Sequence, residues 1–143
     1  MGLRQGCVLS PLLFASYIND LPAELEREGG LGVEIGGGKS MRCMLFADDI
    51  VILDKTREGL QKSLDVASAF SKKWRFAYNF GRDKTAVMVF GGADDGDRWW
   101  LGDTEVLGNT VYRGQERKMG YTENRVSEQR KEVFLCSMGP GNG

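Results

Sequence analysis

The chain has 143 residues, of which 41% are hydrophobic and 27% are charged, so we expect a globular domain rather than a disordered segment. Its formal net charge of −1 argues against a domain that grips nucleic acid through an overall basic surface. Three widely spaced cysteines and no histidine argue against structural zinc and exclude Ser-His-Asp and Cys-His catalysis.

Hydropathy along the chain is that of a soluble protein. No run approaches about 20 apolar residues, and the first residues do not form a signal peptide. We therefore expect an intracellular protein with no membrane partner. Cys7 and Cys43 lie among apolar residues, which predicts buried thiols in a reducing compartment.

Two helices are predicted, each with an apolar stripe at helical spacing. The first covers residues 11–27 and opens with Ser-Pro at 10–11, because proline fits the first helical turn. Pro22 should end or kink it. The second covers residues 57–74 and begins after Thr56, a favourable cap.

Two adjacent carboxylates interrupt a long apolar run. Asp48 and Asp49 separate the strand-like segments 41–46 and 50–54. Two such charges about 5 Å apart repel by about 3 kcal/mol at an effective dielectric of about 20. The simplest geometry is a tight hairpin with both acids at its tip, where divalent cations take oxygen ligands. The alternative is that both residues serve only as turn formers.

These elements predict an α+β fold. We expect an antiparallel sheet with both helices packed on one face, since the strands are apolar without clear alternation. The predicted strands are residues 33–35, 41–46, 50–54 and 86–90.

Beyond Gly91 the sequence becomes polar, rich in glycine and weakly periodic. We expect a short edge strand at 99–101 and a helix at 123–134. The predicted organisation is therefore a folded part at 1–91 and a divergent, loop-rich, poorly structured tail at 92–143.

Two short motifs fail their spacing tests. Gly-Lys-Ser at 38–40 would need a glycine where Val33 stands to form a phosphate-binding loop. The acidic segment at 94–97 lacks the ligand positions of a calcium loop.

An ordered series of motifs resembles the reverse transcriptase domain of non-LTR (LINE-type) retrotransposons over residues 2–90. The combination of the block at 2–11 with the Phe-Ala-Asp-Asp block at 46–49 is highly specific. The blocks are Gly-Leu-Arg-Gln-Gly-Cys-Val-Leu-Ser-Pro at 2–11, Tyr-Ile-Asn-Asp-Leu at 17–21, Phe-Ala-Asp-Asp at 46–49 and Asn-Phe-Gly-Arg-Asp-Lys-Thr at 79–85. The resemblance implies a partial polymerase palm.

The resemblance also implies metal chemistry. Asp48 and Asp49 match the aspartates that bind Mg²⁺ in the palm hairpin, and Asp48 is the stronger candidate for direct coordination. Lys84 matches a palm lysine that acts on the leaving pyrophosphate as a cation or proton donor. The alternative for Lys84 is an exposed loop charge.

Nucleotide and template contacts are implied for the first block. Gln5 and Gly6 match the segment that packs near the incoming nucleotide and the template base, and Arg4 could counter phosphate charge. The alternative is that Gln5 and Gly6 only form a turn before the helix.

The first catalytic aspartate of the family lies on a strand before the Gln-Gly block, and this chain begins inside that block. We expect an RNA-directed DNA polymerase fragment that is inactive alone. Its intact parent would use RNA template, DNA primer and dNTP, in the nucleus.

The main alternative is a non-catalytic remnant or protein-interaction module that self-associates through an exposed sheet edge. A third hypothesis is a small Mg²⁺- or nucleotide-binding domain unrelated to polymerases.

Overall fold

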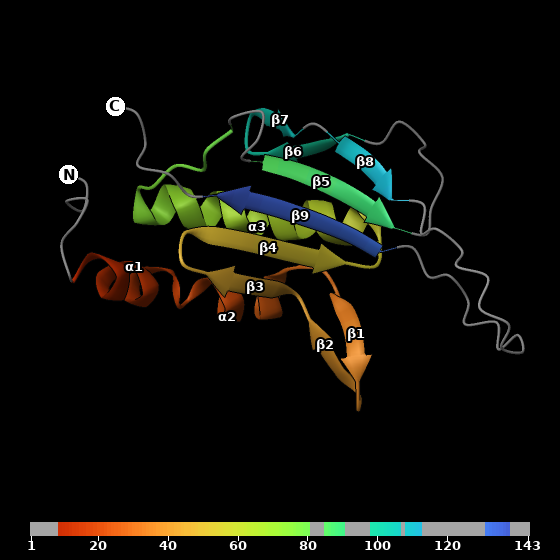
Figure 1. The fold of residues 1–143 in the computed structure, drawn as a ribbon, viewed down its shortest axis with the longest axis horizontal. Helices are drawn as coiled ribbons and strands as arrows, with labels where there is room; N and C mark the ends of the chain where they lie inside the picture. Colours follow the sequence, from red (N-terminus) through yellow and green to blue (C-terminus); the bar gives the residue numbers. More distant parts are fainter. Residues whose placement is uncertain (1–8, 81–84, 91–97, 107, 113–130, 138–143) are drawn as a thin grey trace, which may run out of the picture.

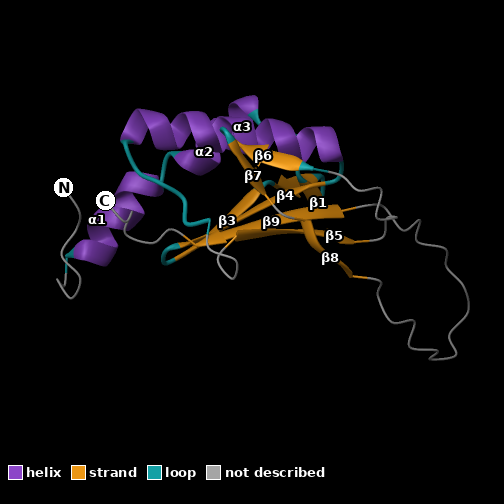
Figure 2. Cartoon of the chain, turned by 90° about the horizontal axis from the view of Figure 1, so that it is seen from above, coloured by secondary structure: helices purple, strands orange, loops and turns teal. Residues whose placement is uncertain are grey.

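The computed structural model describes residues 9–80, 85–90, 98–106, 108–112 and 131–137. In this part of the chain a five-stranded sheet carries helices on one face (Figures 1 and 2), so the α+β prediction is confirmed. No helix of these residues is long and apolar enough to cross a membrane.

The main sheet is antiparallel except for its last pair of strands, which is parallel. The strand order is β3 (Cys43–Phe46), β4 (Asp49–Asp54), β9 (Lys131–Ser137), β5 (Thr85–Phe90) and β8 (Gly108–Tyr112). The predicted strands at 50–54 and 86–90 thus belong to the sheet but are not neighbours, because β9 lies between them.

The predicted helix at 11–27 is two helices, α1 (Ser10–Ile18) and α2 (Leu21–Glu28). The break precedes Pro22, which lies in the first turn of α2, where its missing N–H is not needed. The predicted break near Pro22 is thus confirmed, and the proline itself lies in the first turn of the second helix.

A separate hairpin replaces the predicted sheet strand at 33–35. It pairs β1 (Val33–Gly36) with β2 (Lys39–Met41) and projects from the body of the molecule (Figure 1). The predicted strand at 41–46 is split at Arg42, whose Nε donates a 2.9 Å hydrogen bond to the carbonyl of Gly30. This bond helps to hold the corner between the hairpin and the main sheet.

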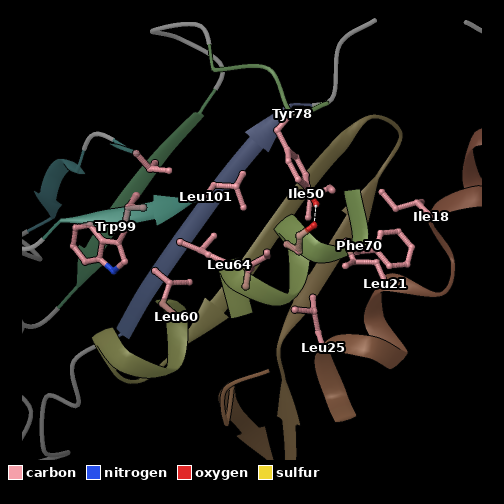
Figure 3. Packing of buried hydrophobic residues seen from close by; sticks show 14 of the residues in the cluster. Ile18, Leu21, Leu25, Ile50, Leu60, Leu64, Phe70, Tyr78, Trp99 and Leu101 are labelled. Atoms are coloured by element: carbon pink, nitrogen blue, oxygen red, sulfur yellow. Dashed lines mark hydrogen bonds between the residues drawn. The ribbon is translucent and has the colours of Figure 1, made fainter. Parts of the chain in front are cut away.

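Helix α3 (Arg57–Trp74) covers the sheet as predicted. Thr56 caps it by accepting a 3.0 Å hydrogen bond from the Gly59 N–H. Its apolar face packs on Ile50, Ile52 and other buried side chains of the core (Figure 3). Each such large side chain stabilises the fold by about 1.5–3 kcal/mol when fully buried.

The tail contributes strands to the fold. The predicted strand at 99–101 is confirmed as β6 (Trp99–Leu101), which pairs with β7 (Thr104–Val106) and buries Trp99 in the core. Residues 131–134 of the predicted helix lie in strand β9, so that prediction is wrong there. Its first residues, 123–130, lie outside the described part, and the division at Gly91 stays a prediction.

Candidate functional site

The two adjacent aspartates lie at a hairpin turn, as predicted. Phe46 of β3 pairs with Asp49 of β4, which leaves Ala47 and Asp48 as a two-residue connection. Ala47 has a φ of 52°, in the left-handed region that tight hairpin turns need. A non-glycine residue adopts this conformation at a cost of about 1 kcal/mol. The tight turn places the two carboxyl-bearing residues side by side at one end of the sheet.

The two aspartates differ in exposure. Asp48 is exposed in the turn, whereas Asp49 is half-buried as the first residue of β4. Ile50 and Ile52 are fully buried on the face that α3 covers, so strand alternation puts Asp49 on the opposite face. No described helix covers that face, which is here called the open face. Asp48 therefore lies at the end of the sheet and Asp49 lies on its open face. A hydrated cation could approach both carboxylates from there.

An exposed aromatic ring lies beside the carboxylates. Phe46 is 82% exposed, and its register opposite Asp49 places it on the same open face. Met44, two residues earlier on β3, is also exposed. Their sequence pattern predicts ordinary strand residues, because an exposed large apolar side chain cannot be distinguished from a core residue by composition alone.

The neighbouring strand brings no third carboxylate to the pair. Ser137, the last residue of β9, stands opposite Asp49 in the register. Within the described residues, no group of three or more His, Cys, Asp or Glu side chains could hold a metal ion. Asp48 and Asp49 are thus hard oxygen donors that fit part of a Mg²⁺ site, but two carboxylates do not complete one.

The start of β5 lies at the same end of the sheet as the aspartates. Thr85 pairs with Cys136, and Cys136 pairs in turn with Ile50, the residue after Asp49. Two strand spacings separate Thr85 from Ile50, which is about 10 Å. The structure therefore brings the strand that follows Lys84 to the end of the sheet that bears the Asp pair.

The other predicted site residues, Arg4, Gln5, Gly6 and Lys84, lie outside the described residues. Their roles stay predictions.

The thiol of Cys43 on β3 is not an activated nucleophile. Burial raises its pKa from 9.0 to about 11, so the sulfur carries its proton at neutral pH. Cys43 was predicted to be buried, and the structure shows it half-buried, while Cys7 lies outside the described residues.

Comparisons with known proteins support the family resemblance. The family model described as reverse transcriptase (RNA-dependent DNA polymerase) matches residues 1–130. The chain belongs to the reverse transcriptase family. This reverse transcriptase domain is 43% identical over 63 residues to the "Retrovirus-related Pol polyprotein from type-1 retrotransposable element R2" of Nasonia vitripennis. The predicted membership among non-LTR reverse transcriptases is thereby confirmed.

The match to the Nasonia polyprotein covers 44% of this chain and 6% of that protein. The reverse transcriptase domain thus corresponds to a small part of its relative's length. No solved structure matches it.

Proposed function

We propose that this chain forms part of the palm of an RNA-directed DNA polymerase, with Asp48 and Asp49 contributing carboxylates to Mg²⁺. The observation that carries the proposal is the two-residue turn, which presents both acids at one end of the sheet. A bound Mg²⁺ ion would supply positive charge to a transferring phosphate. The hairpin's own contribution is to hold two acceptors side by side in spite of their mutual repulsion.

The remaining partners are proposed from the family. In a complete enzyme, Arg4, Gln5 and Gly6 would contact the incoming dNTP and the template base, and Lys84 would act on the leaving pyrophosphate. The substrates would be an RNA template and a DNA primer, and the place of action would be the nucleus.

We further propose that the chain alone does not polymerise. Ser137 occupies the register position opposite Asp49, and a serine hydroxyl cannot replace a carboxylate as an anionic metal ligand. Two carboxylates should bind Mg²⁺ weakly and should not hold a primer 3′-hydroxyl in line for attack, which is where most of the rate originates.

A second candidate function is a protein-interaction module. Strand β3 is the edge of the five-stranded sheet, and within the described sheet its one neighbour is β4. Its exposed side chains Met44 and Phe46 make this edge apolar on the open face. Such an edge can pair with another strand, including the β3 strand of a second copy.

The metal site is tested with Mn²⁺, a paramagnetic substitute for Mg²⁺, by electron paramagnetic resonance of the free ion. The wild-type chain should bind Mn²⁺ weakly, and Asp48→Asn and Asp49→Asn should each abolish that binding. Asp103→Asn is the matched control, because Asp103 is an exposed aspartate in the turn between β6 and β7. Wild-type affinity in both hairpin variants would refute the metal site.

Catalysis is tested separately by primer extension on an RNA template. We expect no extension by the wild-type chain. Extension that is lost in Asp48→Asn would disprove the proposed inactivity while supporting the polymerase assignment.

A further inference from the structure

The C-terminal end of α3 is strongly basic. Lys72, Lys73 and Arg75, here called the basic end of α3, place three positive charges within four residues, and all three are exposed. The chain as a whole has a net charge of −1. Because charges are screened over about 8 Å at physiological salt, a local cluster matters more to a bound polyanion than the net charge does.

Within the described residues, two of the three charges have no ion-pair partner. Lys73 is 63% exposed and its Nζ lies 3.4 Å from Glu24 Oε1, while the other oxygen of Glu24 accepts a 2.6 Å hydrogen bond from Arg27. In the described part of the chain, Lys72 and Arg75 form no ion pair. An exposed ion pair such as Lys73–Glu24 is weak and leaves the lysine available to another anion.

Arg75 occupies a backbone position that normally favours glycine. Its φ is 56°, and its N–H donates to the carbonyl of Ser71 to close the helix. Glycine or asparagine is usual at such helix ends, and other residues adopt this conformation at a cost of about 1 kcal/mol. Residues in such sparsely populated backbone conformations are concentrated at functional sites, which makes the Arg75 side chain a candidate for a role beyond closing the helix.

The helix dipole offers a simpler explanation for part of this cluster. Lysines in the last turn of a helix are stabilised by the partial negative charge of the free carbonyls. That effect accounts for Lys72 and Lys73. It does not account for Arg75, because a glycine there would close the helix without strain.

The basic end lies at the same end of the molecule as the aspartate turn (Figures 1 and 2). Strand β4 starts at Asp49 and leads away from the turn, and α3 then returns along the sheet. Its 18 residues span about 27 Å, more than the roughly 20 Å of the strand, so the helix reaches back to the level of the turn.

We propose that the basic end of α3 binds the phosphates of a single-stranded nucleic acid. Exposed lysine and arginine side chains at a helix end suit a polymer backbone that passes over them, whereas small ligands prefer concave sites. The choice of nucleic acid among polyanions rests on the proposed polymerase function, but the contact itself requires neither metal nor the Asp pair.

The test measures binding of a fluorescently labelled single-stranded RNA by anisotropy, in EDTA, from about 50 to about 200 mM salt. Lys72→Gln and Arg75→Gly should each raise Kd by about three- to tenfold at the lowest salt. Each should also reduce the slope of log Kd against log salt by about 0.7, the value for one lost contact to a single strand. The control is Lys62→Gln, which removes an exposed lysine from the first half of the same helix and should leave both quantities unchanged.

Arg75→Gly separates binding from folding. Glycine adopts the left-handed conformation freely, so this variant should unfold at the same temperature as wild type or higher, while binding RNA more weakly. Unchanged affinity in Lys72→Gln and Arg75→Gly would overturn the proposal. An equal loss of RNA affinity in Lys62→Gln would also overturn it. Binding of free nucleoside triphosphate without binding of RNA would do the same. Because EDTA removes divalent ions, RNA binding can fail or succeed independently of Mn²⁺ binding by Asp48 and Asp49.

Discussion

Asp54 shows how a buried charge can serve the fold rather than chemistry. It is 1% exposed at the end of β4, and its carboxylate accepts hydrogen bonds from Gly32 N, Thr56 N and the Thr56 hydroxyl at 2.9, 3.0 and 3.2 Å. A Cβ atom at Gly59 would lie 2.0 Å from Asp54 Oδ1, so glycine is required where α3 begins. Asp54 therefore joins the corner at Gly32 to the start of α3, at the far end of β4 from Asp49.

Asp54→Asn should lower the free energy of unfolding by about 2–3 kcal/mol. Each carboxylate oxygen of Asp54 accepts from a backbone N–H, so the amide NH₂ of an asparagine must face a donor and leave it unsatisfied. Urea denaturation measures the change. Asp65→Asn, at an exposed position of α3, should shift the free energy by less than about 0.5 kcal/mol. Equal stability of the Asp54 and Asp65 variants would contradict this role.

At the scale of elements, strand β9 decides how much of the polymerase site the chain can build. It lies antiparallel to both β4 and β5, between the two strands that α3 connects. The position next to Asp49 is thus taken by a strand from the tail, and the residue there is a serine. The strand arrangement is suited to a third ligand, but the sequence of β9 does not supply one.

Ser137→Asp should increase the affinity for Mn²⁺ by about tenfold, which corresponds to about 1.4 kcal/mol. Ser137 stands directly opposite Asp49 in the backbone register, so Ser137→Asp adds a third acid at the register position beside the Asp pair. Electron paramagnetic resonance of free Mn²⁺ again provides the measurement. Ser137→Asn, which adds a similar volume without charge, should retain the wild-type affinity. If the aspartate and asparagine variants bind alike, the register position does not contribute to the site.

At the scale of the whole molecule, the described helices cover one face of the sheet and leave the other uncovered. Helix α3 covers one face, and the exposed side chains Met44 and Phe46 lie on the other, next to the edge of β3. The arrangement has consequences for assembly, because exposed apolar side chains and the edge of the described sheet occur together at β3.

We expect the chain to self-associate through this edge. Sedimentation velocity should reveal concentration-dependent dimers, and Phe46→Lys should reduce their fraction because an exposed lysine disfavours edge pairing. Leu31→Lys is the matched control, because Leu31 is 74% exposed before the separate β1–β2 hairpin. A purely monomeric chain at high concentration, or dimers unaffected by Phe46→Lys, would rule out association through β3.

Local signals in the sequence determined several features of this protein correctly. The apolar stripe and Thr56 defined α3, because an amphipathic helix with a cap needs no information from distant residues. The apolar segments on either side of Asp48 and Asp49 defined the hairpin for the same reason, since a two-residue turn is a short-range event. The ordered motifs identified the family.

Long-range pairing decided the rest. Residues 131–134 were expected to be helical, and only contact with β4 and β5 makes them a strand, because a short apolar segment fits either structure. At the corner between the β1–β2 hairpin and the main sheet, Arg42 donates a hydrogen bond to the carbonyl of Gly30, and Gly32 N–H donates one to Asp54. The sequence by itself thus placed the two acids at a turn, whereas the tertiary structure placed Ser137 beside them and the basic end of α3 at their end of the molecule. Those positions arise from contacts between residues far apart in the chain, which no local pattern encodes.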